Sequence, residues 1–533
     1  MTVVVPAPVA SEPPAAGRPR LPVGPRLARA VLLFAAFACA ACGLVYELAL
    51  LTLGSYLVGD TVRQASLVLS VFVFSMGVGA LASKRLRHRP VLGFAVIEAA
   101  LALTGGLSVL ALYAAFAWLD LYQPALLVVS FVVGALVGAE IPVLMTLLQQ
   151  IRPQEAGTAV ADLSAADYVG ALVGGLAFPF LLLPRFGQLR GALVVGMVNA
   201  AAAALVAGWL FRPALGPGAR RAVAAALAGV VLVLAGVGLV ADRFEVSARQ
   251  ALFDDPIVHR QQSAYQEIVL TESLSLTGQR DLRLFLDGDL QFSSVDEYRY
   301  HEALVHPAMA GRHERVLVLG GGDGLAAREV LRYPDVRSLT LVELDPAVVR
   351  RARDDARVAD LNSRSLDDPR VEVVTADAFG WLREDRGGFD VIVADFPDPE
   401  SSATAKLYSQ EFYAMAASAL TPSGRLVVQA GSPAFARQAF WCIDATVAAA
   451  GLDRVAYHVD VPSFGDWGFV LAGRGPPVLE LPRPVPEGLR SLDGPALAAA
   501  AVFPPDRQRL DVDVSTLTSP RILDYQRAGW RGY

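Results

Sequence analysis

The sequence contains little cysteine and no concentrated stretch of positive charge. Its 533 residues include three cysteines, Cys39, Cys42 and Cys442, which are too few for a disulfide framework. Cys39 and Cys42 form a C-x-x-C pattern inside an apolar run, where we expect packing residues and neither a redox site nor a metal site. The 46 lysines and arginines form no long run and the net charge is -6, so the sequence shows no footprint of nucleic-acid binding.

The N-terminal segment lacks the features of a secretory signal. Residues 1–25 are rich in proline, alanine and valine, and they show no helical period. They also contain no small-residue cleavage site after a short apolar core. We therefore predict a disordered tail over residues 1–25 and not a signal peptide.

Long apolar stretches follow this tail. Hydrophobic residues make up 54% of the chain and the mean hydropathy is +0.44, well above a soluble protein, which places part of the chain in a lipid bilayer. Seven stretches approach the roughly 20 residues that cross a bilayer, and they cover about 30–53, 65–83, 91–117, 124–149, 163–184, 191–211 and 222–241. This pattern predicts an all-α transmembrane bundle of about seven helices over residues 26–242, in a multi-pass protein of the cell membrane.

Basic residues are distributed unequally over the loops between these stretches. One set of alternate loops, with the N-terminal tail, carries twelve lysines and arginines, whereas the other set carries three. The excess of positive charge predicts that the N-terminus is cytoplasmic. Seven crossings would then put the C-terminal half outside, although the donor inferred below is an intracellular metabolite in the family that this chain resembles. Either one stretch does not cross or the C-terminal half faces outward, and the sequence allows both.

The composition after residue 242 is that of a soluble protein. Residues 263–292 alternate apolar and polar side chains around turn signals such as Asp287-Gly288, which predicts a small β-strand module over 243–312. Residues 313–475 alternate short apolar strands with helical segments, which predicts a Rossmann-like α/β domain of the methyltransferase type with a parallel sheet. We expect its strands at 316–319, 339–342, 371–374, 391–394 and 425–429. Residues 476–533 form a C-terminal extension.

Three successive strand ends carry residues that suit a nucleoside ligand. Gly320 to Gly324 follow the first strand directly and open a helix, so a ligand can approach the backbone closely. The second strand ends in Glu343, where an acid accepts hydrogen bonds from ribose hydroxyls, and the third leads to Asp377 and Ala378, placed to bind an adenine amino group. Because the glycines lack the full G-x-G-x-x-G spacing, the set indicates an S-adenosylmethionine-type site rather than an NAD site.

Asp323, within the glycine turn, distinguishes between two donors of this type. S-adenosylmethionine carries a carboxylate, which the side chain of Asp323 would repel. Its decarboxylated form carries only an ammonium group, which the same side chain would attract. Because a juxtaposition of like charges is strongly unfavourable, the sequence predicts decarboxylated S-adenosylmethionine as a co-substrate, with no bound cofactor.

The segment Asp395-Phe396-Pro397-Asp398-Pro399 follows the fourth strand, where the reactive carbon of the donor is expected. An amine that attacks the methylene beside a sulfonium must first lose a proton, because a free alkylammonium has a pKa of about 10.4. We assign Asp395 as the general base and Asp398 as the anchor of the amine. The chemistry requires no metal, since the sulfonium is already an activated electrophile.

Several separate motifs between residues 263 and 471 agree in order and spacing with one family. They are Tyr265-Gln266, Leu286-Asp287-Gly288 with Gln291, Asp296-Glu297-Tyr298, Tyr300-His301-Glu302, Gly320 to Gly324 with Arg328-Glu329-Val330, Glu343, Asp377, Asp395 to Pro399, Phe412-Tyr413 and Gln429. Together they resemble the spermidine synthase family, and the apolar half resembles the subgroup fused to N-terminal transmembrane helices. The resemblance implies transfer of an aminopropyl group to putrescine or a related diamine, giving spermidine and methylthioadenosine.

The resemblance also implies roles for individual residues. Those that bind the donor are Gln266, Asp323, Glu343, Asp377 and Ala378. Those that surround the amines are Tyr300, His301, Asp395, Asp398 and Gln429, with Asp395 as the proton acceptor.

Two departures from the family pattern fall on the acceptor side. The Gly-Pro pair that usually follows Pro399 is replaced by Glu400-Ser401-Ser402, and Phe464 stands where the family commonly has a tyrosine. The identity of the acceptor therefore stays open. Two other functions also stay open: a transferase of the same fold with another donor or acceptor, such as a methyltransferase, and a polyamine transporter or sensor with an inactive domain. The oligomeric state is equally open, including a homo-oligomer.

Five acidic residues lie in or near the apolar stretches, where a charge is costly and often functional. They are Glu47, Glu98, Glu140, Asp162 and Asp167. One interpretation is a path for cationic polyamines. The other is that these acids lie near the membrane interface or pair with other groups inside the bundle.

Overall fold

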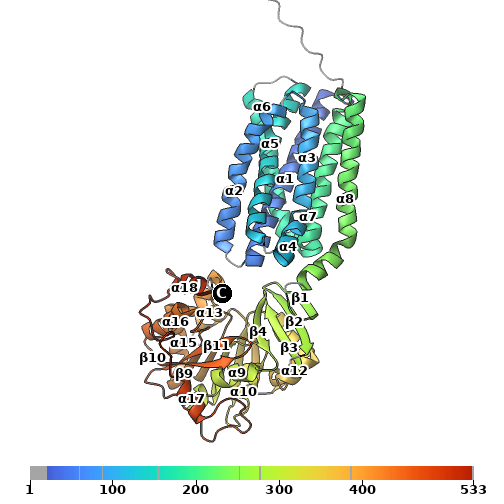
Figure 1. Ribbon diagram of the computed structural model, residues 1–533. Coiled ribbons are helices and arrows are strands. Elements are labelled where there is room, and N and C mark those ends of the chain that lie inside the picture. The colour runs from blue at the N-terminus through green and yellow to red at the C-terminus, as the bar shows by residue number, and fades with distance from the viewer. Residues whose placement is uncertain are drawn as a thin grey trace, which may run out of the picture. The chain divides into compact units, whose positions relative to one another are not determined.

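The computed structural model describes residues 21–58, 61–86, 88–119, 121–152, 156–250, 253–274, 278–384 and 387–530 (Figure 1). Most of the expected N-terminal tail, residues 1–20, lies outside the described residues. The chain divides into two compact units between Leu252 and Phe253. Each unit is described by itself below.

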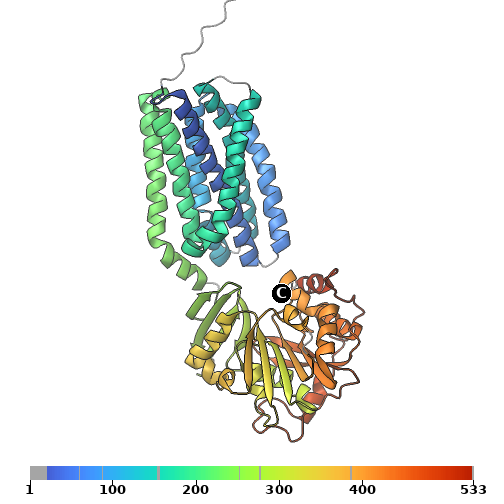
Figure 2. The ribbon, with the colours of Figure 1, turned by 180° about the vertical axis from the view of Figure 1, so that it is seen from behind.

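The first unit consists of helices that lie side by side in a bundle (Figures 1 and 2). Two short π-helical segments, Phe178–Leu182 and Ala204–Leu210, continue the helices that precede them. The α-helices of this unit are α1 (Pro25–Val58), α2 (Thr61–Ala82), α3 (Pro90–Gly106), α4 (Ser108–Leu119), α5 (Tyr122–Ile151), α6 (Ala156–Ala177), α7 (Leu183–Ala203) and α8 (Pro217–Gln250).

Six helical segments within the described residues are long and apolar enough to cross a membrane. The fifth of them, Gly157–Leu210, has 54 residues, whereas about 20 suffice for one crossing. Gly187, inside α7, interrupts this segment with a non-helical φ of 68° and ψ of -175°, so the segment consists of two helices that meet at this kink. The expected helical bundle is thus confirmed, and its apolar helices indicate a membrane protein. Each of the seven expected stretches overlaps one of the six segments, and two of them, 163–184 and 191–211, overlap Gly157–Leu210.

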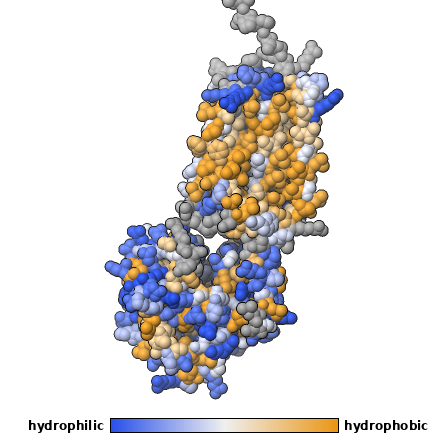
Figure 3. All heavy atoms as spheres, in the orientation of Figure 1, coloured by the Kyte–Doolittle hydropathy of each residue, from blue (hydrophilic) through white to orange (hydrophobic). Residues whose placement is uncertain are grey.

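Small residues let neighbouring helices of this unit approach closely. A Cβ added to Gly138 of α5 would lie 2.0 Å from the carbonyl oxygen of Met76 in α2. A Cβ added to Gly170 of α6 would lie 2.2 Å from the carbonyl oxygen of Phe37 in α1. Such backbone contacts are typical of helices that pack in lipid, where burial of apolar area gives little drive. Figure 3 shows hydrophobic residues over the flank of this unit and hydrophilic residues at one end, as expected for a surface that faces lipid.

The second unit begins with a four-stranded antiparallel sheet in the order β1-β2-β3-β4. Its strands are β1 (Ile257–Gln262), β2 (Glu267–Leu274), β3 (Arg280–Leu286) and β4 (Asp289–Ser293). Helix α8 continues to Gln250, so the strands begin 14 residues after the start of the β-strand module expected at residue 243.

A seven-stranded mixed sheet follows in the order β10-β11-β9-β8-β5-β6-β7. Its strands are β5 (Arg315–Gly320), β6 (Ser338–Glu343), β7 (Val371–Thr375), β8 (Phe389–Asp395), β9 (Leu420–Gln429), β10 (Asp453–Val461) and β11 (Gly465–Gly473). Strands β5 to β9 are parallel, which confirms the expected Rossmann-like α/β class. Strands β10 and β11 pair antiparallel at one edge and were not part of the expectation.

Both faces of this sheet are covered. Val316 and Val318 of β5 belong to one buried core, whereas Leu317 and Leu319 point to the opposite face and belong to another. This alternation explains why the parallel strands read as continuous apolar runs. The helices that cover the two faces or extend the domain are α9 (Glu297–Val305), α10 (Leu325–Val330), α11 (Pro346–Asp354), α12 (Ala356–Leu361), α13 (Ala378–Leu382), α14 (Ser402–Ala405), α15 (Gln410–Ala419), α16 (Arg437–Ala449), α17 (Gly494–Ala500) and α18 (Arg521–Trp530).

The C-terminal extension packs onto this α/β domain. Ile522 and Leu523 of α18 are buried in the same core as Leu317 and Leu319. The last helix is therefore part of the folded domain, and its other residues can reach the ligand site.

Candidate active site

A cavity of about 890 Å³ lies where the parallel strands of the second unit end. Gly320, Glu343, Asp395 and Gln429 are the last residues of β5, β6, β8 and β9, and all four line it. Ligands of open α/β sheets bind at this edge. The lining includes all ten residues singled out from the sequence, namely Gln266, Tyr300, His301, Asp323, Glu343, Asp377, Ala378, Asp395, Asp398 and Gln429.

The glycine turn after β5 lies directly against the end of β8. Gly320 and Gly321 have φ values of 82° and 62°, in the left-handed region that favours glycine. A Cβ at Gly320 would lie 2.0 Å from the carbonyl oxygen of Asp395, so only a residue without a side chain fits there. The backbone N–H of Gly321 donates to the same oxygen at 3.2 Å. The turn expected to receive the donor and the expected base therefore share one wall of the cavity.

Two acids expected to bind the donor are partly buried and held by backbone donors. The N–H of Leu325 donates to Asp323 Oδ1 at 2.8 Å, and the N–H of Asp345 donates to Glu343 Oε1 at 2.8 Å. Burial raises the pKa of Asp323, and it raises the pKa of Glu343 to about 7. A ligand that brings positive charge or hydrogen-bond donors to these carboxylates would offset the cost of burying them.

The remaining donor-side residues are tied to neighbouring elements. Gln266 Nε2 donates to Asp345 Oδ2 at 3.3 Å, which connects the small sheet to the start of α11. Lys406 Nζ lies 2.9 Å from Asp377 Oδ2, so one oxygen of that carboxylate is already engaged. Ala378 is the first residue of α13, and N–H groups in a first helical turn have no partner within the helix.

Asp395 accepts a hydrogen bond from a phenol and is influenced by the charge of His301. The Tyr300 hydroxyl donates to Asp395 Oδ1 at 2.6 Å. Burial raises the pKa of Asp395 to about 6, although the charge of His301 and the hydrogen bond from Tyr300 oppose the rise. Burial lowers the pKa of His301, but the hydrogen bond and charge of Glu297, with Asp323 and Asp395, raise it overall to about 9. His301 Nδ1 lies 2.9 Å from Glu297 Oε2, and this contact favours the protonated ring.

Asp398 is held by two side-chain amides. Gln429 Nε2 donates to Asp398 Oδ1 at 3.2 Å, and Gln526 Nε2 of α18 donates to Asp398 Oδ2 at 2.7 Å. Gln429 is itself fixed by contacts to the carbonyl oxygen of Phe396 at 2.7 Å and to the Tyr408 hydroxyl at 2.5 Å. Burial raises the pKa of Asp398, and the two amides oppose the rise. The carboxylate is thus oriented by two neutral donors.

Known proteins of similar sequence align with nearly the whole chain. The family model of the spermine/spermidine synthase domain matches residues 297–475. Polyamine aminopropyltransferase 1 of Streptomyces coelicolor is 60% identical over 513 residues, which is 95% of this chain and 96% of that protein. The chain belongs to the polyamine aminopropyltransferase family. The polyamine aminopropyltransferase of Mycobacterium tuberculosis is 49% identical over 94% of this chain and 97% of its own length. A solved spermidine synthase from Thermotoga maritima is 28% identical, covers 46% of this chain and 84% of its own, and has a TM-score of 0.43.

Membership of this family confirms that the protein is an aminopropyltransferase. Two further acids of this aminopropyltransferase, Asp289 and Glu400, line the cavity and were not expected from the sequence. Burial raises the pKa of Asp289 to about 6, and the charge of Asp398 adds to the rise. Burial raises the pKa of Glu400 to about 7, and the charges of Asp289 and Asp398 add to the rise. Glu400 lies in the segment that replaces the Gly-Pro pair usual in the family, and that departure was the one available signal.

An aromatic wall closes the cavity near Tyr300. The ring of Phe464 lies 5.9 Å from the ring of Tyr300, edge to face, and 5.1 Å from the ring of Trp467. Phe464 thus fills its place by packing, without the hydroxyl that a tyrosine would add. Gln526 was also missed, because nothing in the sequence of α18 indicates that it reaches Asp398.

Proposed function

We propose that this aminopropyltransferase transfers the aminopropyl group of decarboxylated S-adenosylmethionine to a diamine such as putrescine. The products are spermidine and methylthioadenosine. The observation that supports the proposal is the shared wall of the glycine turn and Asp395, which puts a half-buried carboxylate beside the place where the donor is expected.

The donor side favours a molecule without a carboxylate. Asp323 and Glu343 both face the cavity, and burial raises the pKa of each, which means that their charged forms are already disfavoured. A further carboxylate from the donor would make this environment still less favourable. An ammonium group would instead offset the charge of Asp323. Glu343 at the end of β6 is placed to accept hydrogen bonds from ribose hydroxyls.

The transfer is a substitution at carbon. The amine nitrogen forms a bond to the methylene beside the sulfonium, the carbon–sulfur bond breaks, and its electron pair stays on sulfur. Methylthioadenosine leaves as a neutral thioether, and the proton that the amine loses passes to Asp395. A carboxylate with a pKa of about 6 is ionised at neutral pH and can hold the ammonium before it accepts the proton.

His301 acts on this base through its charge in our proposal. Its imidazolium would repel an ammonium, but it lowers the pKa of Asp395 and of Asp323 and so favours the ionised form of both carboxylates. Glu297 holds the imidazole, and Arg328 in turn donates to both oxygens of Glu297 at 2.9 Å. The positive charge of His301 is thereby fixed in place.

The apolar helices give the enzyme its location. We propose that it is a multi-pass protein of the cell membrane, because the described residues contain six segments suited to crossing a bilayer. The ten site residues all follow residue 253, so the chemistry is assigned to the second unit.

Product analysis tests the proposed reaction. The purified protein with decarboxylated S-adenosylmethionine and putrescine is expected to yield methylthioadenosine and spermidine, measured by liquid chromatography and mass spectrometry. With S-adenosylmethionine it is expected to yield little S-adenosylhomocysteine.

Asp323→Asn should weaken the preference for the decarboxylated donor, so that the ratio of the two donor affinities measured by calorimetry moves toward one. The amide neither attracts the ammonium nor repels the carboxylate. An unchanged ratio would contradict the role of Asp323, and S-adenosylhomocysteine as the main product would contradict the reaction.

Asp289 and Glu400 are expected to strengthen acceptor binding. Both retain accessible surface toward the cavity, and each ion pair with the far ammonium of the acceptor should contribute at most about 1 kcal/mol. Asp289→Asn and Glu400→Gln should therefore each raise the KM for the diamine by up to about fivefold and leave the KM for the donor unchanged. Asp360→Asn, which changes an exposed acid outside the cavity, is the matched control. Equal effects on both KM values would show that the two acids do not face the acceptor.

A further inference from the structure

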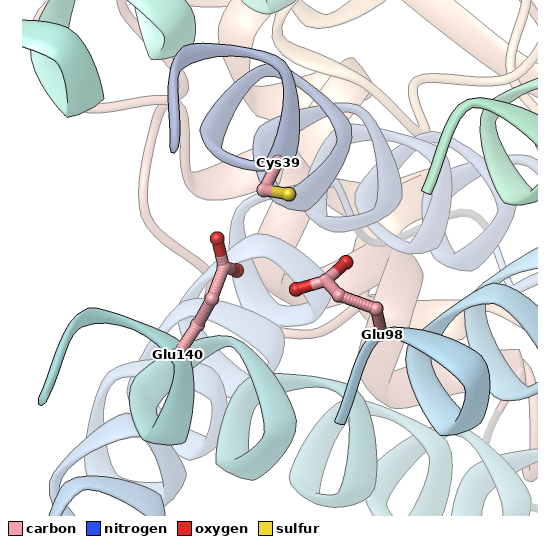
Figure 4. Close-up of side chains that lie close together, drawn as sticks. All are labelled: Cys39, Glu98 and Glu140. Atoms are coloured by element: carbon pink, nitrogen blue, oxygen red, sulfur yellow. The ribbon is translucent and has the colours of Figure 1, made fainter. Parts of the chain in front are cut away.

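Three potential metal ligands meet inside the helical unit. They are Cys39 of α1, Glu98 of α3 and Glu140 of α5, with exposed fractions of 0%, 0% and 4%. One ligand atom from each, the cysteine sulfur and a carboxylate oxygen of each glutamate, lies within 4.8 Å of the other two. Figure 4 shows the three side chains converging from their helices, with the carboxylates of Glu98 and Glu140 directed toward the space beside the thiol.

The buried carboxylate of Glu98 indicates that this space holds a ligand. Neither of its carboxylate oxygens has a hydrogen-bond partner in the part of the chain that the structure describes, although the side chain is fully buried. Buried polar atoms in native proteins are nearly always paired, and an unpaired one calls for a partner such as an ion.

We propose that Cys39, Glu98 and Glu140 bind one divalent cation of the zinc class within the helical bundle. Zinc lies about 2.3 Å from cysteine sulfur and about 2.0–2.2 Å from carboxylate oxygen, so in tetrahedral geometry two of its ligand atoms are about 3.5 Å apart. The ligand atoms of the cluster lie within 4.8 Å of one another, so they would have to move together by at most about 1.3 Å to reach tetrahedral separations. Three protein ligands leave the fourth tetrahedral position for water.

The donor set selects this class of cation. A thiolate together with carboxylates suits zinc and similar borderline metals, whereas calcium and magnesium prefer six or more oxygen ligands. The alkylammonium of a polyamine would pair with the two carboxylates, but it would gain little from Cys39, because sulfur is a weak hydrogen-bond acceptor. A dication also offsets two of the three negative charges that a thiolate and two carboxylates bring into an apolar bundle, where unpaired charge is costly. Cys39, expected from the sequence to be a packing residue, is thus a metal ligand in this proposal.

Metal loading of the full-length protein in detergent tests the site. After treatment with a chelator, the protein is expected to bind one equivalent of Zn²⁺ or Co²⁺. The Co²⁺ form should show a thiolate-to-cobalt charge-transfer absorption in the near ultraviolet. Cys39→Ser should remove this absorption. Glu98→Gln and Glu140→Gln should each lower the affinity for Zn²⁺ at least about tenfold, since even loss of an outer-shell contact costs about that much.

Cys42→Ser is the matched control. Cys42 lies one turn further along α1, is also buried, and places its thiol 3.7 Å from the carbonyl oxygen of Val195. This variant should keep both the Co²⁺ absorption and the stoichiometry. Equal loss in Cys42→Ser, less than one equivalent bound by the wild type, or Co²⁺ bound without the charge-transfer band would each overturn the proposal. So would displacement of the metal by spermidine at equal concentration. Should Cys39→Ser fail to elute as a single folded species, the wild-type spectrum decides.

Discussion

The variant Asp395→Asn is expected to lower the rate of aminopropyl transfer at least about a hundredfold, because the amide keeps the shape of the side chain and cannot accept a proton. Tyr300 can still donate to the amide oxygen, so the wall of the cavity should be preserved. Single-turnover kinetics with saturating donor and diamine measure the effect. Binding of methylthioadenosine, measured by calorimetry, should stay close to that of the wild type. Transfer at the wild-type rate would show that another group takes the proton.

The pH profile gives an independent check on this assignment. With a pKa of about 6, Asp395 is mostly a carboxylate at neutral pH and becomes protonated below pH 6. The wild-type kcat/KM should therefore rise with pH up to about 6, and at pH 5 only roughly one-tenth of the base is ionised. Tyr300→Phe removes a hydrogen bond that lowers the pKa of Asp395, so it should move this acid limb to higher pH. If the acid limb of Tyr300→Phe stays at the pH of the wild type, protonation of Asp395 does not cause that limb.

Much of the parallel sheet could be predicted because its strands are buried on both faces. β5 and β8 consist almost entirely of buried residues between turns, so each reads as a short apolar run. β10 carries Asp453, Arg454, His458 and Asp460 and is only partly buried, so it has no such run. Its partner β11 pairs with β9 across more than 30 residues of intervening chain, an antiparallel contact that no local pattern specifies.

The candidate site divides in the same way. Asp323, Glu343 and Asp395 could be placed because each lies at or shortly after the end of a strand, and the ends of parallel strands share one edge. Gln526 could not, since it lies 128 residues beyond Asp398 on a helix whose docking is set by tertiary packing. Asp289 enters the site only once the small sheet is placed beside the large one.

The helical unit shows where hydropathy stops being informative. The apolar runs predict helices, and the structure confirms them. Hydropathy does not specify which faces of α1, α3 and α5 meet, because these helices are apolar on nearly every side. Cys39, Glu98 and Glu140 are more than 40 residues apart in the sequence, and only the packing of three helices brings them within 4.8 Å.

The last prediction is that residues 253–533, expressed without the helical unit, form a domain that is soluble without detergent and retains aminopropyl transfer. Each unit has its own core: the buried clusters of the second unit contain only residues from Ile268 onward, and those of the first end before the boundary at Leu252. The cavity is lined entirely from the second unit. Circular dichroism, methylthioadenosine binding and product formation measure the outcome, with the Asp395→Asn fragment as the inactive control. A fragment that folds and binds methylthioadenosine but transfers to no amine would show that the helical unit completes the acceptor site.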